Sequence, residues 1–404
     1  MLLLTALLTA LPFVLQASAK KLPPEAFIID EIVKSAKVIA NITDPRVTRD
    51  GLVSTKIAGT RTLWTAGDTM LFDLEKRTGV NPMVVNTASW SDTNADGSPK
   101  IITNGPVGCG SNGSNPILLL YGSPWVKDRT PFYPLDQPNA CKPPRGKCAD
   151  GSRTVLWMES APMVTSSDPK GRTVAYTWVA NWHLLDLAPV GGVTEPSYSL
   201  YKMTYDNTQA DRAQLPVNKL VDAAFYKAGQ LGYGSYGRVV RGGYAYLYGQ
   251  DQWRNTGVAR VPVGHVENQD KYQYFVNNAW TAKRPAIDDV SRWALPNAGG
   301  KQGKYYYSDY FNRFVWIGAR NASMSADFWM STAPKAEGPW KNLTLIYRGE
   351  KGDAGFGAYS LQAHPALLKD RKERGIYLSF TQAWNKTTSP GNGVVTPLIY
   401  VAFN

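Results

Sequence analysis

Two acidic residues, Asp68 and Glu159, have surroundings that suit acid/base chemistry. Asp68 lies in the segment TAGDT and Glu159 in WMESAP, each beside a short apolar run and small or turn-forming residues. Carboxylates are scarce in this chain, with 32 Asp and Glu against 44 Lys and Arg. Burying a carboxylate costs free energy unless it is paired or used. The two residues therefore suggest a proton donor and an ionised partner.

The neighbours of each carboxylate favour a different role. Trp157 and Pro162 give Glu159 apolar surroundings, which raise a carboxyl pKa and suit the acid. Gly67 and Thr69 offer Asp68 backbone and hydroxyl donors, which suit the ionised base. The alternative is structural: Asp68 closes a turn and Glu159 forms an ion pair with an arginine.

A third acidic candidate, Asp92, lies in the segment WSDT and could tune a neighbouring pKa. The segment NADG follows at once, so turn formation through an Asx side chain is the alternative. The loop lacks the ligand spacing of a standard calcium loop, and we predict no metal and no cofactor.

A glycine-rich segment, GYGSYGR, spans residues 232–238. It lacks the Gly-Lys-Ser/Thr ending of a phosphate loop. It presents Tyr233 and Tyr236, which could stack against sugars or pack in a core. Arg238, which follows them, could bind an anionic group.

The chain has three histidines. His183 and His364 end apparent strands, whereas His265 lies in a turn and is expected at the surface. Polar neighbours surround His364, which is either a binding residue or a satisfied structural histidine.

The first 19 residues are typical of a secretory signal, with an apolar run and the cleavage-like triplet Ala17-Ser18-Ala19. No later segment is long and apolar enough to span a membrane. Five acceptor triplets for N-linked glycans support secretion. The acceptor asparagines are Asn41, Asn112, Asn321, Asn342 and Asn385.

Three cysteines lie in one Gly/Pro-rich region: Cys109, Cys141 and Cys148. One disulfide with a leftover thiol is the simplest arrangement in an oxidising compartment, and all three pairings stay open. The net charge of +12 suits contact with anionic polysaccharide, a wall or a phospholipid surface. The alternative is a solvated surface that is simply basic. No recognition-helix pattern or concentrated basic stripe suggests nucleic acid.

Short β-runs separated by turns dominate the chain, and aromatic-rich runs recur at about 60 to 90 residues. This predicts an all-β, five-bladed β-propeller after the signal peptide and a short N-terminal helical segment. The expected divisions are residues 1–19, 20–54 and 55–404. Helical spacing is confined to two segments, Pro24–Lys37 and Pro216–Ala228.

Three segments resemble a secreted domain family of long-unknown function that is associated with endo-arabinanase activity. The first runs from Ala259 through Arg260-Val261-Pro262 and YQYF to Trp280; the others are STAPKAEGPW, at 331–340, and the early Gly67-Asp68-Thr69. The resemblance covers roughly residues 55 to 404 and implies a five-bladed β-propeller glycosidase. In related furanosidases the acid lies in a Glu-x-Pro-like motif, which the WMESAP segment approximates with one extra residue before its proline.

These observations favour a secreted glycoside hydrolase that acts on a polysaccharide through two carboxylates. One alternative is a lyase acting on a uronate-containing glycan, with His364 or His183, Tyr233 and Arg238 as its reactive residues. Another is a carbohydrate-binding propeller without catalysis. The expected partner is a polysaccharide, neutral or anionic, and the oligomeric state stays open.

Overall fold

The computed structural model describes residues 32–73, 78–103, 116–123, 130–138, 140–141, 147–168, 170–208, 211–321, 324–385 and 393–404. Their regular structure is almost entirely β-strand, which confirms the all-β class. Helix in the described residues is limited to Ile32, α3 (Val290–Trp293) and short 3₁₀ turns. Those turns are η2 (Val190–Gly192), η3 (Val263–His265), η4 (Gln269–Lys271) and η5 (Pro365–Leu367). No helix within these ranges is long and apolar enough to cross a membrane.

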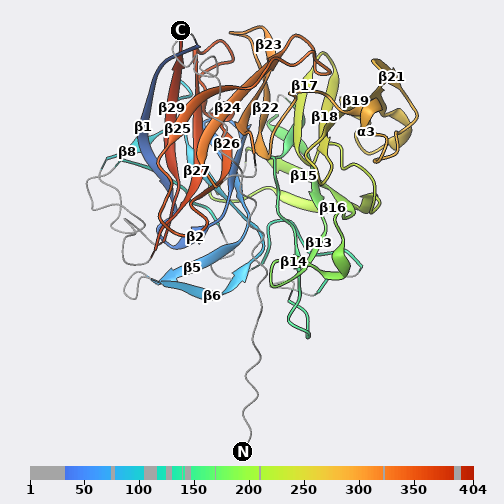
Figure 1. Cartoon of the computed structure of the whole chain (residues 1–404). Coiled ribbons are helices and arrows are strands. Elements are labelled where there is room, and N and C mark those ends of the chain that lie inside the picture. The colour runs from blue at the N-terminus through green and yellow to red at the C-terminus, as the bar shows by residue number, and fades with distance from the viewer. Residues whose placement is uncertain are drawn as a thin grey trace, which may run out of the picture.

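Five main sheets follow one another along the chain (Figure 1), and the first four are antiparallel. The first contains β3 (Leu52–Ala58), β4 (Arg61–Ala66) and β7 (Thr87–Asp92). The second contains β11 (Met163–Ser167), β12 (Arg172–Ala180), β15 (Tyr198–Asp206) and β16 (Val217–Tyr226). The third contains β17 (Gly237–Arg241), β18 (Tyr244–Gln250), β19 (Thr256–Pro262), β20 (Gln273–Val276) and β21 (Ala279–Thr281). The fourth contains β22 (Gln302–Ser308), β23 (Arg313–Ala319), β24 (Ala326–Ala333) and β25 (Thr344–Gly349).

The fifth sheet joins both ends of the described chain, because the N-terminal β1 pairs with the C-terminal β29 (Figure 1). Its strands are β26 (Ala358–Ala363), β27 (Gly375–Ala383), β29 (Pro397–Phe403), β1 (Val33–Thr43), β9 (Ile117–Leu119) and β8 (Ile101–Ile102), with β28 (Val394–Val395) beside β27. Two small sheets complete the set. They contain β2 (Val47–Arg49), β5 (Thr69–Asp73) and β6 (Thr78–Val84), and β10 (Arg153–Val155), β13 (Trp182–Leu185) and β14 (Ala188–Pro189).

The first strands of the five main sheets contact one another in a closed order. β3 contacts β11, β11 contacts β17, β17 contacts β22, β22 contacts β26, and β26 contacts β3. Buried aromatic side chains pack between neighbouring sheets. Tyr248 of the third sheet, for example, stacks on Tyr305 of the fourth at a centroid separation of 3.8 Å. Residues from five distant parts of the sequence thereby meet around the first strands.

Among the described residues of the two predicted helical segments, Ile32 is helical, but the prediction was wrong for most of the others. Residues 33–37, the C-terminal part of the first predicted helix, belong to β1, and Val217–Tyr226 of the second is the strand β16. Both strands pair along their length with a neighbour, β29 and β15 respectively. Tertiary hydrogen bonding therefore overrode a weak local helical pattern. Since β1 is integral to the fifth sheet, part of the expected 20–54 segment belongs to the fold.

One predicted strand is in fact a hairpin. The expected run from 238 to 248 divides into β17 and β18 at Gly242-Gly243, where both residues have positive φ, +58° and +79°. Two consecutive residues with positive φ form the tight turn that matches the twist of paired strands.

Candidate active site

An acidic cavity lies at the starting ends of the first strands. Its volume is about 260 Å³, and its walls come from loops before β3, β5 and β11 and from the starts of β22 and β26. The side chains on which its chemistry depends are Asp50, Asp68, Trp157, Glu159, Gln302 and Tyr359. The two predicted catalytic residues, Asp68 and Glu159, therefore line the same cavity.

Asp68 is buried and held by Arg153. Its side chain is 8% exposed, and Arg153 Nη1 and Nη2 donate to its two carboxylate oxygens at 3.0 and 2.7 Å. Such a two-fold, charge-assisted contact fixes the position and orientation of a carboxylate. The arginine also lies over the Trp157 ring, 5.5 Å from its centroid. With both oxygens engaged, Asp68 is better placed to orient and balance charge than to take a proton from water.

Asp50, which the sequence analysis missed, accepts fewer side-chain hydrogen bonds than Asp68. It precedes β3, and Tyr359 Oη donates to its Oδ1 at 2.6 Å. Burial raises the pKa of Asp50 to about 6; the Tyr359 hydrogen bond opposes this, Asp68 adds to it and Arg153 opposes it. A carboxyl that titrates near neutral pH in a cavity is a candidate for proton transfer.

Backbone hydrogen bonds tie the loops of the two aspartates together. Asp50 N donates to the Asp68 carbonyl at 2.9 Å, and Gly67 N donates to the Asp50 carbonyl at 2.8 Å. The only local signal for Asp50 is an Asp-Gly turn before an apolar strand, with Gly51 at φ +51°. This pairing of Asp with Gly is similar to the Gly67-Asp68 pair by which Asp68 was selected as a candidate.

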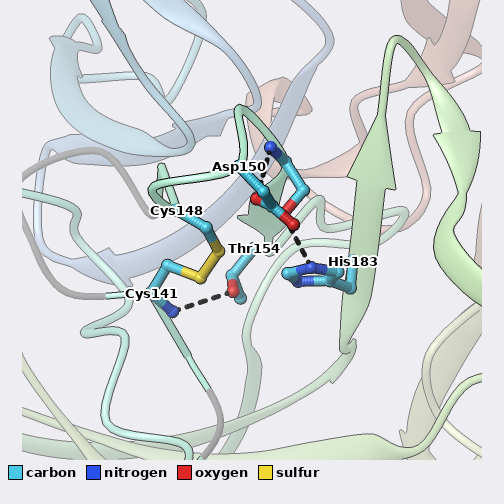
Figure 2. Close-up of a disulfide and its surroundings, with 6 residues drawn as sticks. Cys141, Cys148, Asp150, Thr154 and His183 are labelled. Atoms are coloured by element: carbon cyan, nitrogen blue, oxygen red, sulfur yellow. Dashed lines mark hydrogen bonds between the residues drawn. A yellow bond between two sulfur atoms is a disulfide. The ribbon is translucent and has the colours of Figure 1, made fainter.

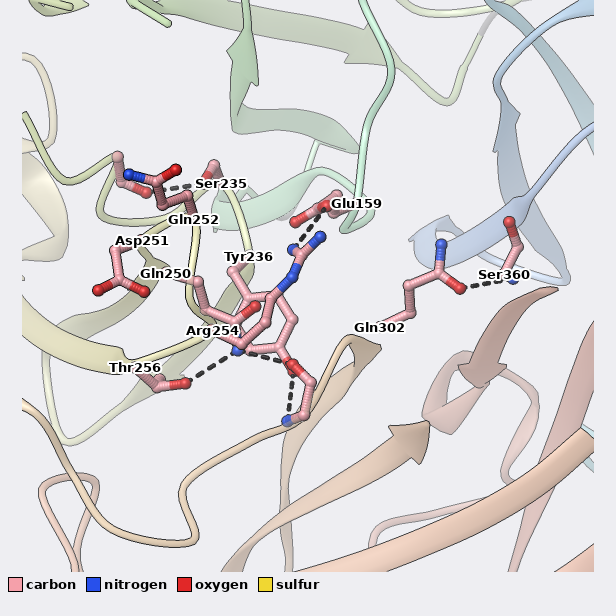
Figure 3. Close-up of polar contacts among 12 residues, drawn as sticks. Glu159, Ser235, Tyr236, Gln250, Asp251, Gln252, Arg254, Thr256, Gln302 and Ser360 are labelled. Atoms are coloured by element: carbon pink, nitrogen blue, oxygen red, sulfur yellow. Dashed lines mark hydrogen bonds and ion pairs between the residues drawn. The ribbon is translucent and has the colours of Figure 1, made fainter. Parts of the chain in front are cut away.

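Glu159 lies where the acidic cavity meets a second cavity. Its side chain is 42% exposed, and Arg254 Nη1 approaches its Oε1 at 3.9 Å (Figure 3). Partial enclosure of the carboxyl by the cavity walls raises its pKa, while Arg254 and Lys301 lower it. A raised pKa together with access to solvent suits a residue that delivers a proton to a bound ligand.

The second cavity extends the acidic cavity into an aromatic groove. Its volume is about 320 Å³, and it shares Trp157 and Glu159 with the acidic cavity. Trp178, Trp182 and Tyr198 contribute further rings to its wall. Flat apolar rings beside hydrogen-bonding groups suit a chain of sugar rings.

Two further carboxylates and one guanidinium line this groove. Burial raises the pKa of Glu195, whose Oε1 accepts from Gln252 N at 2.6 Å. Asp251 lies beside it, and Arg254, which has a positive φ of +69°, reaches back to Glu159 (Figure 3). The groove is therefore more acidic than basic.

Arg238 supports the candidate site from behind rather than facing it. It is buried, and its guanidinium donates to the carbonyls of Ser160, Ala161 and Gly234. The first two carbonyls immediately follow Glu159, so Arg238 holds the segment that carries this residue. Burial lowers the pKa of Arg238 to about 10. Its predicted role as a binding residue of this groove is not favoured by this placement.

Three other predicted binding residues are enclosed in the core. Tyr233 and Tyr236 are buried, and Tyr236 Oη donates to the Gly300 carbonyl at 3.0 Å. This favours the core-packing alternative over sugar stacking for both. His364 is also fully buried, between Ser54 Oγ at 2.8 Å and Ser379 Oγ at 2.7 Å. Burial, followed by the charge of Lys304, lowers its pKa to about 3, so it is a satisfied neutral histidine.

Asp92 and His183 lie away from both cavities of the candidate site. Asp92 accepts hydrogen bonds from Tyr121 Oη at 2.7 Å and Arg212 Nη2 at 2.9 Å. His183 Nε2 lies 2.9 Å from Ser152 Oγ, beside a disulfide between Cys141 and Cys148 (Figure 2).

The disulfide resolves one choice that the sequence left open, since Cys141 bonds to Cys148. Cys109 lies outside the described residues. Cys141, Cys148 and His183 lie close enough together to resemble a metal-ligand cluster. Because the two sulfur atoms are bonded to each other, they are not available as thiolate ligands.

Three of the predicted glycan acceptors, Asn321, Asn342 and Asn385, are exposed. Asn41 is half-buried within β1, and Asn112 lies outside the described residues. The geometry thus suits glycan attachment better at the first three positions than at Asn41.

The fold and site define an all-β protein of five radially contacting sheets, with an acidic, aromatic-lined groove at the starts of their first strands. The chain belongs to the family described as a domain of unknown function, DUF5005, whose sequence model matches residues 182–387. This confirms the coarser part of the resemblance inferred from the sequence. No curated protein matches the sequence.

Among solved structures, the chain resembles a protein from Bacteroides ovatus provisionally assigned as a hydrolase. The TM-score is 0.57 at 15% identity over 87% of this chain and 85% of that chain. A family 117 glycoside hydrolase from Zobellia galactanivorans aligns at 0.44 and 11% over 92% and 90%. An α-L-arabinofuranosidase from Podospora anserina, solved with cellotriose, aligns at 0.40 and 11% over 91% and 95%. The similarity to the Bacteroides ovatus protein is one of fold.

Proposed function

We propose that this protein is a glycoside hydrolase that cleaves a polysaccharide by carboxylate acid/base catalysis. The observation that carries the proposal is the acidic cavity, where Asp50, Asp68 and Glu159 have three different environments. One carboxylate is neutralised by an arginine, and two have raised pKa values. Glycoside hydrolysis requires a protonated carboxyl and an ionised carboxylate on either side of the scissile bond.

In this proposal Glu159 is the general acid. Its raised pKa favours the protonated form, and its position where the two cavities meet suits a glycosidic oxygen that spans them. Proton transfer from its carboxyl would allow the leaving sugar to depart as a neutral alcohol. Arg238 then acts through the backbone, by fixing the carbonyls that follow Glu159.

Asp50 replaces Asp68 as the proposed base. The Tyr359 hydroxyl stabilises its ionised form, which either removes a proton from the attacking water or attacks the anomeric carbon itself. Asp68 and Arg153 orient the loops and set the local charge. The anomeric configuration of the first product distinguishes the two routes for Asp50, because direct attack retains the configuration and activation of water inverts it.

The charge of the groove favours a neutral glycan over a uronate. Within the described residues, its carboxylates outnumber its single lining arginine, Arg254. A lyase needs a cation to neutralise the substrate carboxylate and a Tyr or His base beside it. The residues predicted for that role, Tyr233, Arg238 and His364, are buried and engaged elsewhere. The lyase alternative is therefore not favoured.

The proposal also includes a five-bladed β-propeller as the architecture and secretion as the destination. The closed order of contacts among five first strands supports the blade count. The apolar start of the sequence and the exposed acceptor asparagines support export through a secretory route.

The test is a screen of arabinan, arabinogalactan, xylan, galactan and pectate with two readouts. Reducing ends report hydrolysis, and near-ultraviolet absorbance reports the unsaturated product of a lyase. We expect reducing ends from at least one neutral polysaccharide without absorbance. Products that absorb in the near ultraviolet would show that the protein is a lyase and not a hydrolase. Affinity for a glycan without any released product would indicate a binding protein instead.

A further inference from the structure

A basic cavity lies farther along the same first strands, beyond the acidic cavity. Its volume is about 400 Å³. The acidic cavity reaches Val53 of β3 and Gln302 of β22, and the basic cavity begins at Ser54 and Lys304 of the same strands. Its cationic lining residues are Lys56, Arg238, Lys304, Lys369 and Arg371. No Asp or Glu is among the described residues that line it.

Lys304 is the central cation of this cavity. Its residue is only 8% exposed, and its ammonium makes no hydrogen bond or ion pair with any residue that the structure describes. Burial, and to a smaller extent Arg238, lowers its pKa to about 7. An ammonium in so enclosed a place without a protein partner is costly unless water or an anion in the cavity compensates its charge.

Tyr306 provides a second donor that lacks a partner. It lies two residues after Lys304 on β22 and therefore projects from the same face of the strand. It is also 8% exposed, and its hydroxyl has no hydrogen-bond partner within the described ranges. Both donors line the basic cavity.

The surrounding charges do not neutralise Lys304. Arg238 has its donors engaged by backbone carbonyls, which leave its positive charge in place. His364, nearby, is neutral because burial lowers its pKa to about 3. At the rim, Lys369 pairs with Asp96 at 2.7 Å, whereas Lys56 is exposed. The net field inside the cavity is therefore positive.

We propose that the basic cavity binds a small inorganic anion, which accepts hydrogen bonds from Lys304 Nζ and Tyr306 Oη. The anion would satisfy both unpartnered donors and balance the charges of Lys304 and Arg238. The rim cations would raise the local anion concentration. Chloride and phosphate share this chemistry and differ in size and charge. The proposal does not depend on the hydrolase assignment, because it uses none of the carboxylates of the acidic cavity.

The experiment is isothermal titration of the full chain with sodium chloride and, separately, sodium phosphate at pH 7 and low ionic strength. We expect saturable binding of at least one anion by the wild type. Lys304→Met should weaken the binding by about tenfold or more, since it removes a charged donor. Tyr306→Phe should weaken it by about fivefold. The control Lys335→Met removes an exposed lysine outside the cavity and should bind like the wild type.

Thermal melting of each variant in the absence of added anion verifies that it is folded. Two results would overturn the proposal. One is a wild type that shows no saturable response to either anion. The other is unchanged affinity in both Lys304→Met and Tyr306→Phe.

Discussion

The acidic and basic cavities are both lined by residues of β3 and β22, yet they are built differently. The acidic cavity takes its carboxylates from loops that precede strands, as with Asp50 before β3 and Glu159 before β11. The basic cavity takes its buried cations from within strands, Arg238 on β17 and Lys304 on β22. Loops vary without disturbing the sheets, so we infer that the acidic cavity determines the reaction.

The largest expected effect on activity comes from substitution of the proposed general acid of the acidic cavity, Glu159. Glu159→Gln should lower the rate of polysaccharide cleavage by about a thousandfold, because a general acid contributes on that order. The loss should be small for a dinitrophenyl glycoside, whose leaving group needs no proton. The measurement is kcat/KM on both substrates. An equal loss on both would assign Glu159 to another role.

A second prediction concerns the ion pair that distinguishes Asp68 from Asp50. Arg153→Met leaves the Asp68 carboxylate buried without a partner and should lower the free energy of unfolding by about 3 kcal/mol. Urea denaturation provides the measurement. The double variant Arg153→Met/Asp68→Asn should recover most of this loss. If the changes in unfolding free energy of the two single variants simply add, the two side chains do not stabilise each other.

The third prediction separates stability from catalysis at Asp50. Its pKa is raised from 3.8 to about 6 in the folded protein. Between these values the folded state binds a proton that the unfolded state has lost, so this group makes stability fall as pH rises. Asp50→Asn removes that cost and should stabilise the protein by about 2 kcal/mol at pH 7. At pH 4 the difference should largely disappear. Equal unfolding free energies at pH 7 would contradict the raised pKa.

The smallest effect should come from the hydrogen bond to Asp50. Tyr359→Phe removes a donor that stabilises the ionised carboxylate, so the pKa of Asp50 should rise further. In a plot of kcat/KM against pH, the midpoint of the fall on the acidic side should then shift to higher pH by about one unit. A profile that does not move would mean that this limb reports another group.

The sequence predicted most strands well because their alternating apolar and aromatic residues are local signals. Thr173–Val179 and Tyr198–Thr204, for instance, fall within β12 and β15. The prediction of helical segments was wrong because strand pairing depends on partners far away in the chain, which a local pattern does not reveal. β1 begins the described chain and pairs with β29 at its end.

The candidate site was predictable only in part. Asp68 and Glu159 were found by local context, and the structure brings them to one cavity. Asp50 was missed because its surroundings come from Tyr359, 309 positions later. Likewise, no local pattern reveals that His364 is enclosed by two serines or that Arg238 turns toward backbone carbonyls.

The most direct test compares two aspartates that carry the same substitution, Asp50→Asn in the acidic cavity and Asp92→Asn outside it. Reducing-end release is measured on the polysaccharide that the wild type degrades. Asp50→Asn should lose about a thousandfold in kcat/KM, while Asp92→Asn should stay close to the wild type. Wild-type activity in a folded Asp50→Asn variant would contradict the assignment of the acidic cavity as the active site.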